Sequence, residues 1–214
     1  TKTLQLLRKE NKLINRFFSI KVKKNIPHGS GLGGGSSDAA TLVNFFNLKM
    51  DLKLNRNSLF RLANNIGSDV FFNIINKNLY ASGNKVTILN PKQRFYILIT
   101  FPFIHCSTKK IYLNNKKFSK SYLITSKDSQ YKKKIIDILK SEHNDLQETV
   151  EQRHPIIRKI IKKISMQKGC YFSRLTGSGS ACIGLFFNMK TASFAKKIIK
   201  RKFPKYWCQT SKTI

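Results

Sequence analysis

The chain has 214 residues, 41% of them hydrophobic, which is enough for one large domain or two small ones. No uncharged apolar run reaches the roughly 18 residues that a membrane-spanning helix needs, so we expect no membrane partner. Lys and Arg total 41 against 10 acidic residues, giving a net charge of +31. Such an excess is typical of nucleic-acid-binding proteins. The lysines are scattered through every segment, however, so we interpret the charge as solvated surface and expect no nucleic-acid partner.

Four cysteines occur, at Cys106, Cys170, Cys182 and Cys208. None forms a Cys-x-x-Cys pair, and no Cys/His spacing is typical of a zinc site. We therefore expect free thiols in a reducing, cytoplasmic environment.

In the first part of the chain, hydrophobic periodicity predicts helices on both sides of a glycine-rich loop. An alternating segment before the loop predicts a half-buried strand. The predicted elements are a helix over 3–17, a strand over 18–23, helices over 37–48 and 57–65, the latter ending at Gly67, and strands over 71–75 and 86–89.

Residues 90–93, Asn-Pro-Lys-Gln, are the best candidate for a domain boundary. The predicted elements after it are strands over 95–101, 171–174, 181–187 and 206–210, and helices over 131–140, 155–164 and 192–202. A strand, two helices, two strands, a helix and a strand, in that order, favour an α+β layer of ferredoxin-like type.

The glycine loop is the most informative segment of the sequence. Five of the 11 glycines lie between positions 29 and 35, directly before an apolar helix. Glycine permits positive φ angles and close approach of backbone N–H groups to an anion. A helix N-terminus also presents unsatisfied N–H groups and a positive dipole end. The loop is therefore a candidate phosphate site.

Three other interpretations of the loop fit less well. No Lys follows the glycines, as a Walker P-loop requires. A Gly-x-Gly-x-x-Gly dinucleotide pattern can be placed on residues 29–34, but the preceding strand has a polar face. A flexible linker would not run straight into an apolar helix that Ser36 and Ser37 can cap. The two serines could cap the helix and contact phosphate at once.

The segment Pro27-His28-Gly29-Ser30-Gly31-Leu32-Gly33-Gly34-Gly35-Ser36-Ser37-Asp38-Ala39-Ala40 resembles the second motif of the GHMP kinases (galactokinase, homoserine, mevalonate and phosphomevalonate kinases). The triple glycine with Ser-Ser-Asp-Ala-Ala is most similar to the diphosphocytidyl-methylerythritol kinase branch. This resemblance implies an α+β, two-domain GHMP kinase fold. Residues 1–90 would form a ribosomal-protein-S5-domain-2-like ATP-binding domain that lacks its first strands, and residues 91–214 a ferredoxin-like domain.

The resemblance also implies ATP and Mg²⁺ as cofactors. The implied ATP-binding residues are Pro27, Gly29, Gly31, Leu32, Gly33, Gly34, Gly35, Ser36 and Ser37. Ser37 is the implied metal ligand. His28 is more consistent with loop packing than with catalysis.

Asp69 lies between the helix stop at Gly67 and an apolar run. A carboxylate can accept the hydroxyl proton during phosphoryl transfer to an alcohol. Spacing alone favours a turn or helix-capping role for Asp69. The segment resembles the family's Gly-[Ala/Ser]-Asp-Val-Pro-Phe stretch, which implies that Asp69 is the catalytic base. Phe71 stands where the family usually has Pro.

Two further segments resemble substrate-site elements of the family. Residues 175–182 resemble its third motif, which implies that Gly177, Ser178 and Gly179 lie at the active site. Thr108 and Tyr112 match positions that line the cytidine side, and a flat aromatic ring could stack on a pyrimidine. A Tyr buried at a helix start is the alternative. Asn144-Asp145-Leu146 matches an element that we interpret as structural.

The family's first motif, with its catalytic Lys, is not found in the 214 residues, so we expect this chain by itself to be a poor enzyme. The implied activity is ATP-dependent phosphorylation of the 2-hydroxyl of 4-diphosphocytidyl-2-C-methylerythritol, in non-mevalonate isoprenoid precursor biosynthesis. Another GHMP kinase, of homoserine or mevalonate type, is the nearest alternative, and a basic nucleic-acid-binding protein is a more distant one. The expected partners are small molecules, in a monomer or homodimer.

Overall fold

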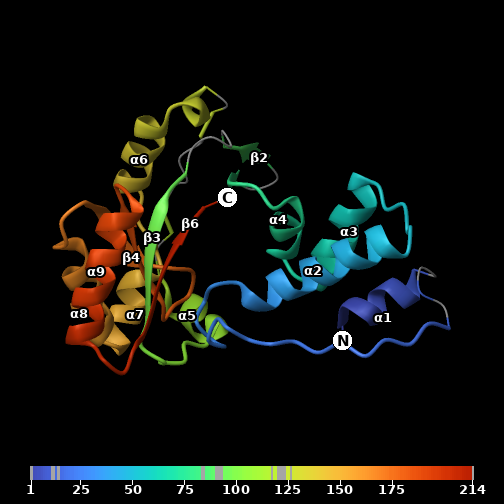
Figure 1. The fold of residues 1–214 in the computed structure, drawn as a ribbon, viewed down its shortest axis with the longest axis horizontal. Coiled ribbons are helices and arrows are strands. Elements are labelled where there is room, and N and C mark those ends of the chain that lie inside the picture. Colours follow the sequence, from blue (N-terminus) through green and yellow to red (C-terminus); the bar gives the residue numbers. More distant parts are fainter. Residues whose placement is uncertain are drawn as a thin grey trace. The chain divides into compact units, whose positions relative to one another are not determined.

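The computed structural model describes residues 2–10, 13, 15–82, 85–89, 94–116, 118–119, 124–125 and 127–213. The chain forms two compact units (Figure 1). The helical unit contains residues 1–25 and 33–77, and the sheet unit contains residues 26–32 and 78–214. Of the helices in the described ranges, none is both long and apolar enough to cross a membrane.

Four helices build the helical unit. They are α1 (Lys2–Lys9), α2 (Gly34–Lys49), α3 (Arg56–Ile66) and α4 (Val70–Ile75). Leu7, Val43, Phe46 and Leu62 are buried together because each helix turns one apolar face inward. The Asn55 side chain caps α3 by accepting the Ser58 N–H at 2.9 Å, and the helix ends at Gly67 as predicted.

Three predictions for this unit are wrong. The first helix ends at Lys9 rather than at residue 17. Residues 18–23 are extended, but the described residues give them no strand partner, so Phe18 and Ile20 only pack on the core. Residues 71–75 lie in helix α4 instead of a strand. A short apolar run does not distinguish a strand from a buried helical turn, and here packing against α2 decides.

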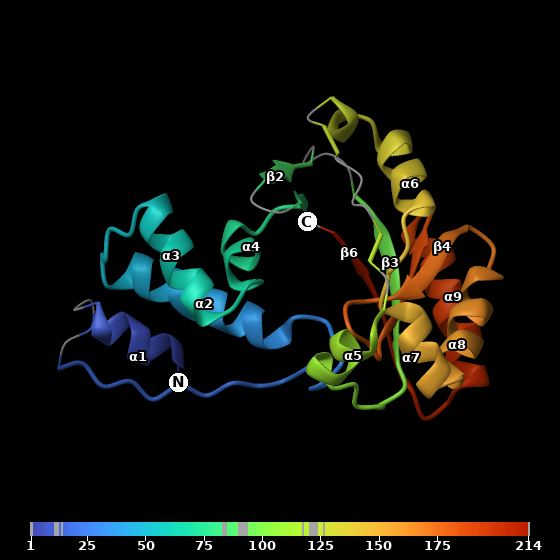
Figure 2. The same ribbon diagram turned by 180° about the vertical axis from the view of Figure 1, so that it is seen from behind.

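The sheet unit is built on four antiparallel strands in the order β4-β5-β3-β6. These strands are β3 (Tyr96–Phe101), β4 (Cys170–Leu175), β5 (Cys182–Phe186) and β6 (Trp207–Lys212). Helices α8 (Ile156–Ser165) and α9 (Met189–Lys202) cover one face (Figure 2). The strand order confirms the predicted ferredoxin-like arrangement.

Alternating side chains of the strands serve two different cores. Leu98 packs with the isoleucines of α8, whereas its neighbour Ile97 packs with Leu185 and helix α6 (Lys132–Ser141). The remaining elements are β1 (Leu79–Ser82), β2 (Lys85–Ile88), α5 (Thr108–Asn114), the 3-10 turn η1 (Asp128–Gln130) and α7 (Gln147–Arg153). Sequence analysis missed β1, α5, η1 and α7, which are all short.

The sequence-based domain boundary at residues 90–93 lies outside the described residues. The two compact units divide instead between Lys77 and Asn78, and residues 26–32 belong to the sheet unit. Domains over 1–90 and 91–214 therefore stay a prediction.

Candidate active site

Helix α2 starts at consecutive glycines, the N-cap Gly33 followed by Gly34 and Gly35, and the space where their side chains would lie is free of other described residues. Gly33 is in the left-handed conformation, with φ of 69°, and its carbonyl accepts the Ser37 N–H at 3.0 Å. The N–H groups of Gly34, Gly35 and Ser36 precede the first intrahelical bond, so the helix itself offers them no acceptor. A Cβ atom added at Gly33, Gly34 or Gly35 would meet no atom of the described residues within 4 Å. Packing among the described residues therefore does not explain the glycines at 34 and 35.

Within the helical unit, an ion pair joins the residues before the glycine loop to helix α2 after it. The Lys24 ammonium donates to the Asp38 carboxylate in the first turns of α2. Both side chains are about two-fifths exposed, at 43% and 39%, so the pair contributes at most about 1 kcal/mol. Its main consequence is geometric, because it holds the residues before the loop beside the helix. Sequence analysis did not single out Lys24.

Asp69 is exposed and lies just before α4. Its carboxylate accepts the Ser68 hydroxyl at 3.3 Å, and its carbonyl accepts the Asn73 amide at 2.8 Å. Both partners are uncharged groups. Ala39 and Ala40 of α2 share one buried cluster with Val70 and Phe71, so the first turns of α2 and the start of α4 are packed together.

The first half of the glycine loop packs on the second glycine turn, inside the sheet unit. The Ala181 N–H donates to the Ser30 carbonyl at 3.1 Å. A Cβ at Gly31 would lie 2.6 Å from the Gly179 carbonyl oxygen, and one at Gly177 would lie 3.2 Å from the Gly31 oxygen. Gly31, Gly177 and Gly179 also have φ angles of 75°, 53° and 87°. These glycines are needed for two backbones to touch.

Thr108 and Tyr112 lie on α5, beside this contact. The Thr108 hydroxyl is 2.8 Å from the Ser178 hydroxyl, so α5 is bonded directly to the second glycine turn. Tyr112 is 52% exposed, which contradicts the alternative of a buried Tyr. Its ring stacks near the exposed ring of Phe118, at 6.3 Å between centroids and an angle of 22°.

The predicted site residues thus fall into two groups. The structure brings Gly31, Thr108, Gly177, Ser178 and Gly179 together in the sheet unit, with Pro27, Gly29, Leu32 and Tyr112 in the same unit. It places Gly33, Gly34, Gly35, Ser36, Ser37 and Asp69 in the helical unit. The chain crosses from one unit to the other at the peptide bond between Leu32 and Gly33.

Two side chains outside the predicted site residues contact the glycine segments. The His105 Nδ1 would lie 3.2 Å from a Cβ at Gly29. Asn144 donates to two carbonyls of the second glycine turn. No local sequence signal marks the His105 contact. Asn144 belongs to a segment that the sequence predicted to be structural, but its contact with Gly177 joins residues 33 positions apart and depends on the tertiary fold.

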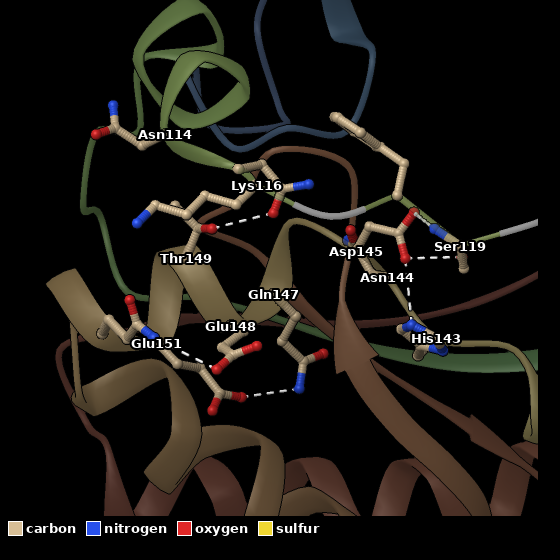
Figure 3. A pocket seen from close by; sticks show the side chains of 13 residues that line it. Asn114, Lys116, Ser119, His143, Asn144, Asp145, Gln147, Glu148, Thr149 and Glu151 are labelled. Atoms are coloured by element: carbon tan, nitrogen blue, oxygen red, sulfur yellow. Dashed lines mark hydrogen bonds and ion pairs between the residues drawn. The ribbon is translucent and has the colours of Figure 1, made fainter.

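A polar pocket of about 730 Å³ is lined in part by Asn144 and Gln147 (Figure 3). Three of its lining residues are acidic, and each is bonded to a neighbour: Asp145 to Ser119, Glu148 to Gln152 and Glu151 to Gln147. The Ser119 bonds hold the pKa of Asp145 below its ordinary value. None of the predicted site residues lines this pocket.

Comparison with known proteins identifies the class. A model described as GHMP kinases N terminal domain matches residues 1–77, and one described as GHMP kinases C terminal matches residues 131–205. Together with the two glycine segments and the ferredoxin-like sheet, these matches define a GHMP kinase, a class of small-molecule kinases.

Curated relatives narrow the class. The 4-diphosphocytidyl-2-C-methyl-D-erythritol kinase of Pelagibacter ubique is 35% identical over 100% of this chain and 75% of the relative. The enzyme of the same name from Chlorobium phaeobacteroides is 32% identical over 89% of this chain and 68% of the relative. The chain therefore belongs to the family of 4-diphosphocytidyl-2-C-methyl-D-erythritol kinases.

Solved structures agree on the fold. A crystal structure of 4-(cytidine 5'-diphospho)-2C-methyl-D-erythritol kinase has a TM-score of 0.64 at 24% identity and covers 88% of this chain and 68% of its own. A homoserine kinase from Cytophaga hutchinsonii has a TM-score of 0.72 at 14% identity, covering 100% of this chain and 74% of its own. At these identities the likeness concerns the fold alone.

Proposed function

We propose that the protein transfers the γ-phosphate of ATP to the 2-hydroxyl of 4-diphosphocytidyl-2-C-methyl-D-erythritol, a step of non-mevalonate isoprenoid precursor synthesis. The names of the curated relatives support this substrate, at 35% and 32% identity. The structural observation that carries the proposal is the open N-terminus of α2. There, Gly34 and Gly35 leave backbone N–H groups accessible without any packing requirement for glycine.

In this proposal the phosphates of ATP bind at the start of α2. The N–H groups of Gly34, Gly35 and Ser36 point out of the helix end, where the helix dipole favours negative charge. Gly33 starts the helix with a positive φ that few other residues adopt. Pro27, Gly29, Gly31 and Leu32 supply the preceding part of the loop.

Mg²⁺ fits the same helix start. Ser37 is exposed in the first turn of α2, and its hydroxyl is the kind of hard oxygen ligand that Mg²⁺ accepts alongside phosphate oxygens. When bound, the ion would neutralise charge on the phosphates.

In this proposal, Asp69 accepts the proton of the substrate hydroxyl. As the hydroxyl oxygen of the substrate bonds to the γ-phosphorus, the bond from that phosphorus to the bridging oxygen of ADP breaks. The hydroxyl proton passes to the Asp69 carboxylate. The carboxylate is exposed and accepts a hydrogen bond from the uncharged Ser68 hydroxyl, so a substrate hydroxyl can approach it.

In this proposal, the cytidine-bearing end of the substrate binds to residues of the sheet unit. The exposed face of Tyr112 can stack on the pyrimidine ring. The paired hydroxyls of Thr108 and Ser178, with the backbone of Gly177 and Gly179, provide polar groups beside it. Because every recognised group is part of a small molecule, the proposal includes no nucleic-acid partner. It also includes a cytoplasmic location and a monomeric or homodimeric state.

The test measures ADP release by the protein with ATP and Mg²⁺ and each of three alcohols: 4-diphosphocytidyl-2-C-methyl-D-erythritol, homoserine and mevalonate. We expect turnover with the first only, and at a low rate, because the family's first motif with its catalytic Lys is not found in these 214 residues. Asp69→Asn should lower kcat by about 10²- to 10⁴-fold, the range that general base catalysis supplies. Asp51→Asn is the matched control, since Asp51 is an exposed acid of the same unit whose recorded partner is Lys53. Turnover of homoserine in preference to the cytidine compound would contradict the substrate, and full activity of Asp69→Asn would contradict the role of Asp69.

A further inference from the structure

The second glycine turn is held from behind by an amide side chain. The Asn144 Nδ2 group donates to the Leu175 carbonyl at 3.0 Å and to the Gly177 carbonyl at 2.8 Å. Its Oδ1 atom accepts the Leu146 N–H at 3.0 Å. Both amide protons and the amide oxygen of Asn144 are thus used, with one bond to the turn at Gly177 and one to Leu175, the residue directly before it.

A neighbouring side chain fixes the other edge of the same turn. Gln147 accepts the Leu175 N–H at 2.9 Å through Oε1 and donates to Glu151 at 2.8 Å through Nε2. Glu151, with a side chain only 9% exposed, is in turn bonded to Arg158 at 2.8 Å. Figure 3 shows Asn144, Gln147 and Glu151 together on the pocket wall. The backbone before the turn therefore has a side-chain partner on both its N–H and its carbonyl.

The turn held in this way carries the contacts of the sheet-unit site. The Gly31 backbone lies against the carbonyl oxygens of Gly179 and Thr176, and the Ala181 N–H bonds to Ser30. The Ser178 hydroxyl bonds to Thr108. A shift of the Gly177 carbonyl would move all of these contacts, because no side chain of the turn glycines packs to resist it.

We propose that Asn144 is a positioning residue for the substrate site: its amide sets the conformation of the Thr176–Gly179 turn and, through that turn, the place of Ser178 and Gly31. The expected effect on substrate binding rests on the proposed function. The effect of Asn144 on the conformation of the turn does not. The three bonds of Asn144 are to backbone groups of Leu175, Gly177 and Leu146, and the proposed function assigns it neither to ATP nor to the reacting hydroxyl. We therefore expect its effect on substrate binding rather than on the chemical step.

Two substitutions separate the amide's functions. Asn144→Asp keeps the shape and the acceptor for Leu146, but it replaces both donors with a carboxylate that repels the carbonyls of Leu175 and Gly177. Asn144→Ala removes all three bonds without adding repulsion. Asn188→Ala is the matched control, because Asn188 caps α9 in the same unit and has no recorded contact with the turn.

Hydrogen exchange tests the structural part without any substrate. In Asn144→Asp, the N–H groups of Gly179 and Ala181, bonded in the wild type to Thr176 and Ser30, should exchange at least about tenfold faster. In Asn188→Ala they should exchange as in the wild type. Equal protection of the turn in Asn144→Asp and the wild type would overturn the inference.

Kinetics tests the functional part. We expect Asn144→Asp to raise KM for 4-diphosphocytidyl-2-C-methyl-D-erythritol about tenfold or more with kcat within about twofold, the pattern of lost uniform binding, and Asn144→Ala to have a smaller effect. If KM instead follows thermal stability across all three variants, including Asn188→Ala, the role is merely structural and the inference fails. If the wild type neither binds nor phosphorylates this substrate, the proposed function fails, and the exchange experiment still decides whether Asn144 holds the turn.

Discussion

At the scale of single residues, the glycines of the loop serve two different purposes. A Cβ atom added at Gly31 would lie only 2.6 Å from the carbonyl oxygen of Gly179. Gly31 also has a positive φ of 75°. Gly34 and Gly35 are helical and would have free space around an added Cβ among the described residues. The first purpose is contact within the protein, and the second is access for a ligand.

This difference gives opposite expectations for two substitutions. Gly34→Ala should raise the free energy of unfolding, by up to about 1 kcal/mol, because Ala is the better helix former. It should nevertheless weaken ATP binding, since the methyl group occupies space that the phosphates need. Gly31→Ala should lower the free energy of unfolding. Chemical denaturation and nucleotide titration of both variants would check this, and tight ATP binding by Gly34→Ala would contradict the phosphate site.

At the scale of elements, the packing of β5 on α8 depends on one missing side chain. Gly184 is buried in β5 beneath Ile164 of α8, and a Cβ there would lie 2.4 Å from the Ile164 Cγ2 atom and 2.9 Å from the Phe186 ring. The strand and the helix can approach as they do only because position 184 has no side chain.

Gly184→Ala should therefore destabilise the sheet unit by about 1–3 kcal/mol, the usual cost of overpacking. Urea denaturation measures this loss, and Gly35→Ala is the control, because its Cβ has free space among the described residues. An unchanged unfolding midpoint for Gly184→Ala would show that α8 moves away from the sheet without cost.

Strand β4 provides a pH-dependent element. Burial is the main cause that raises the pKa of Cys170 from 9.0 to about 11, and a hydrogen bond with the Phe172 backbone partly offsets this rise. Between these values the unfolded chain releases the thiol proton while the folded chain keeps it, so stability is complete below pH 9 and falls as the pH rises toward 11.

Cys170→Ala should remove this contribution to the slope, which is at most about 1.4 kcal/mol per pH unit for one proton. Unfolding free energies of the wild type and the variant at several pH values from 8 to 11 would measure the difference. Parallel curves would mean that the Cys170 thiol titrates alike in the folded and unfolded chain.

At the scale of the whole molecule, charge repulsion opposes folding. The net charge is +31, and the acidic groups are too few to pair with 41 cationic side chains. Repulsion between many exposed like charges destabilises a compact state, and salt screens it within a Debye length of about 10 Å at 0.1 M.

Added NaCl should therefore raise the melting temperature, with most of the gain between about 0.02 and 0.3 M, where the Debye length falls from about 20 to 6 Å. Calorimetry over this range measures the effect, and sucrose at matched osmolality is the control for exclusion effects. A melting temperature that falls with salt would mean that attractive ion pairs dominate.

The sequence by itself determined the class of protein and most of the sheet unit. The Gly33–Ala40 segment is a local signal, since a left-handed glycine and a helix start are dictated by neighbouring residues, and the long periodic segments of α8 and α9 needed no tertiary information. Tertiary structure alone decided the rest. Residues 71–75 became helical through packing on α2, residues 18–23 stayed extended without a recorded partner strand, and Asn144 reached Gly177 across 33 positions of the chain. Such contacts join residues that are far apart in the chain, and no periodicity in a single sequence records which distant groups meet.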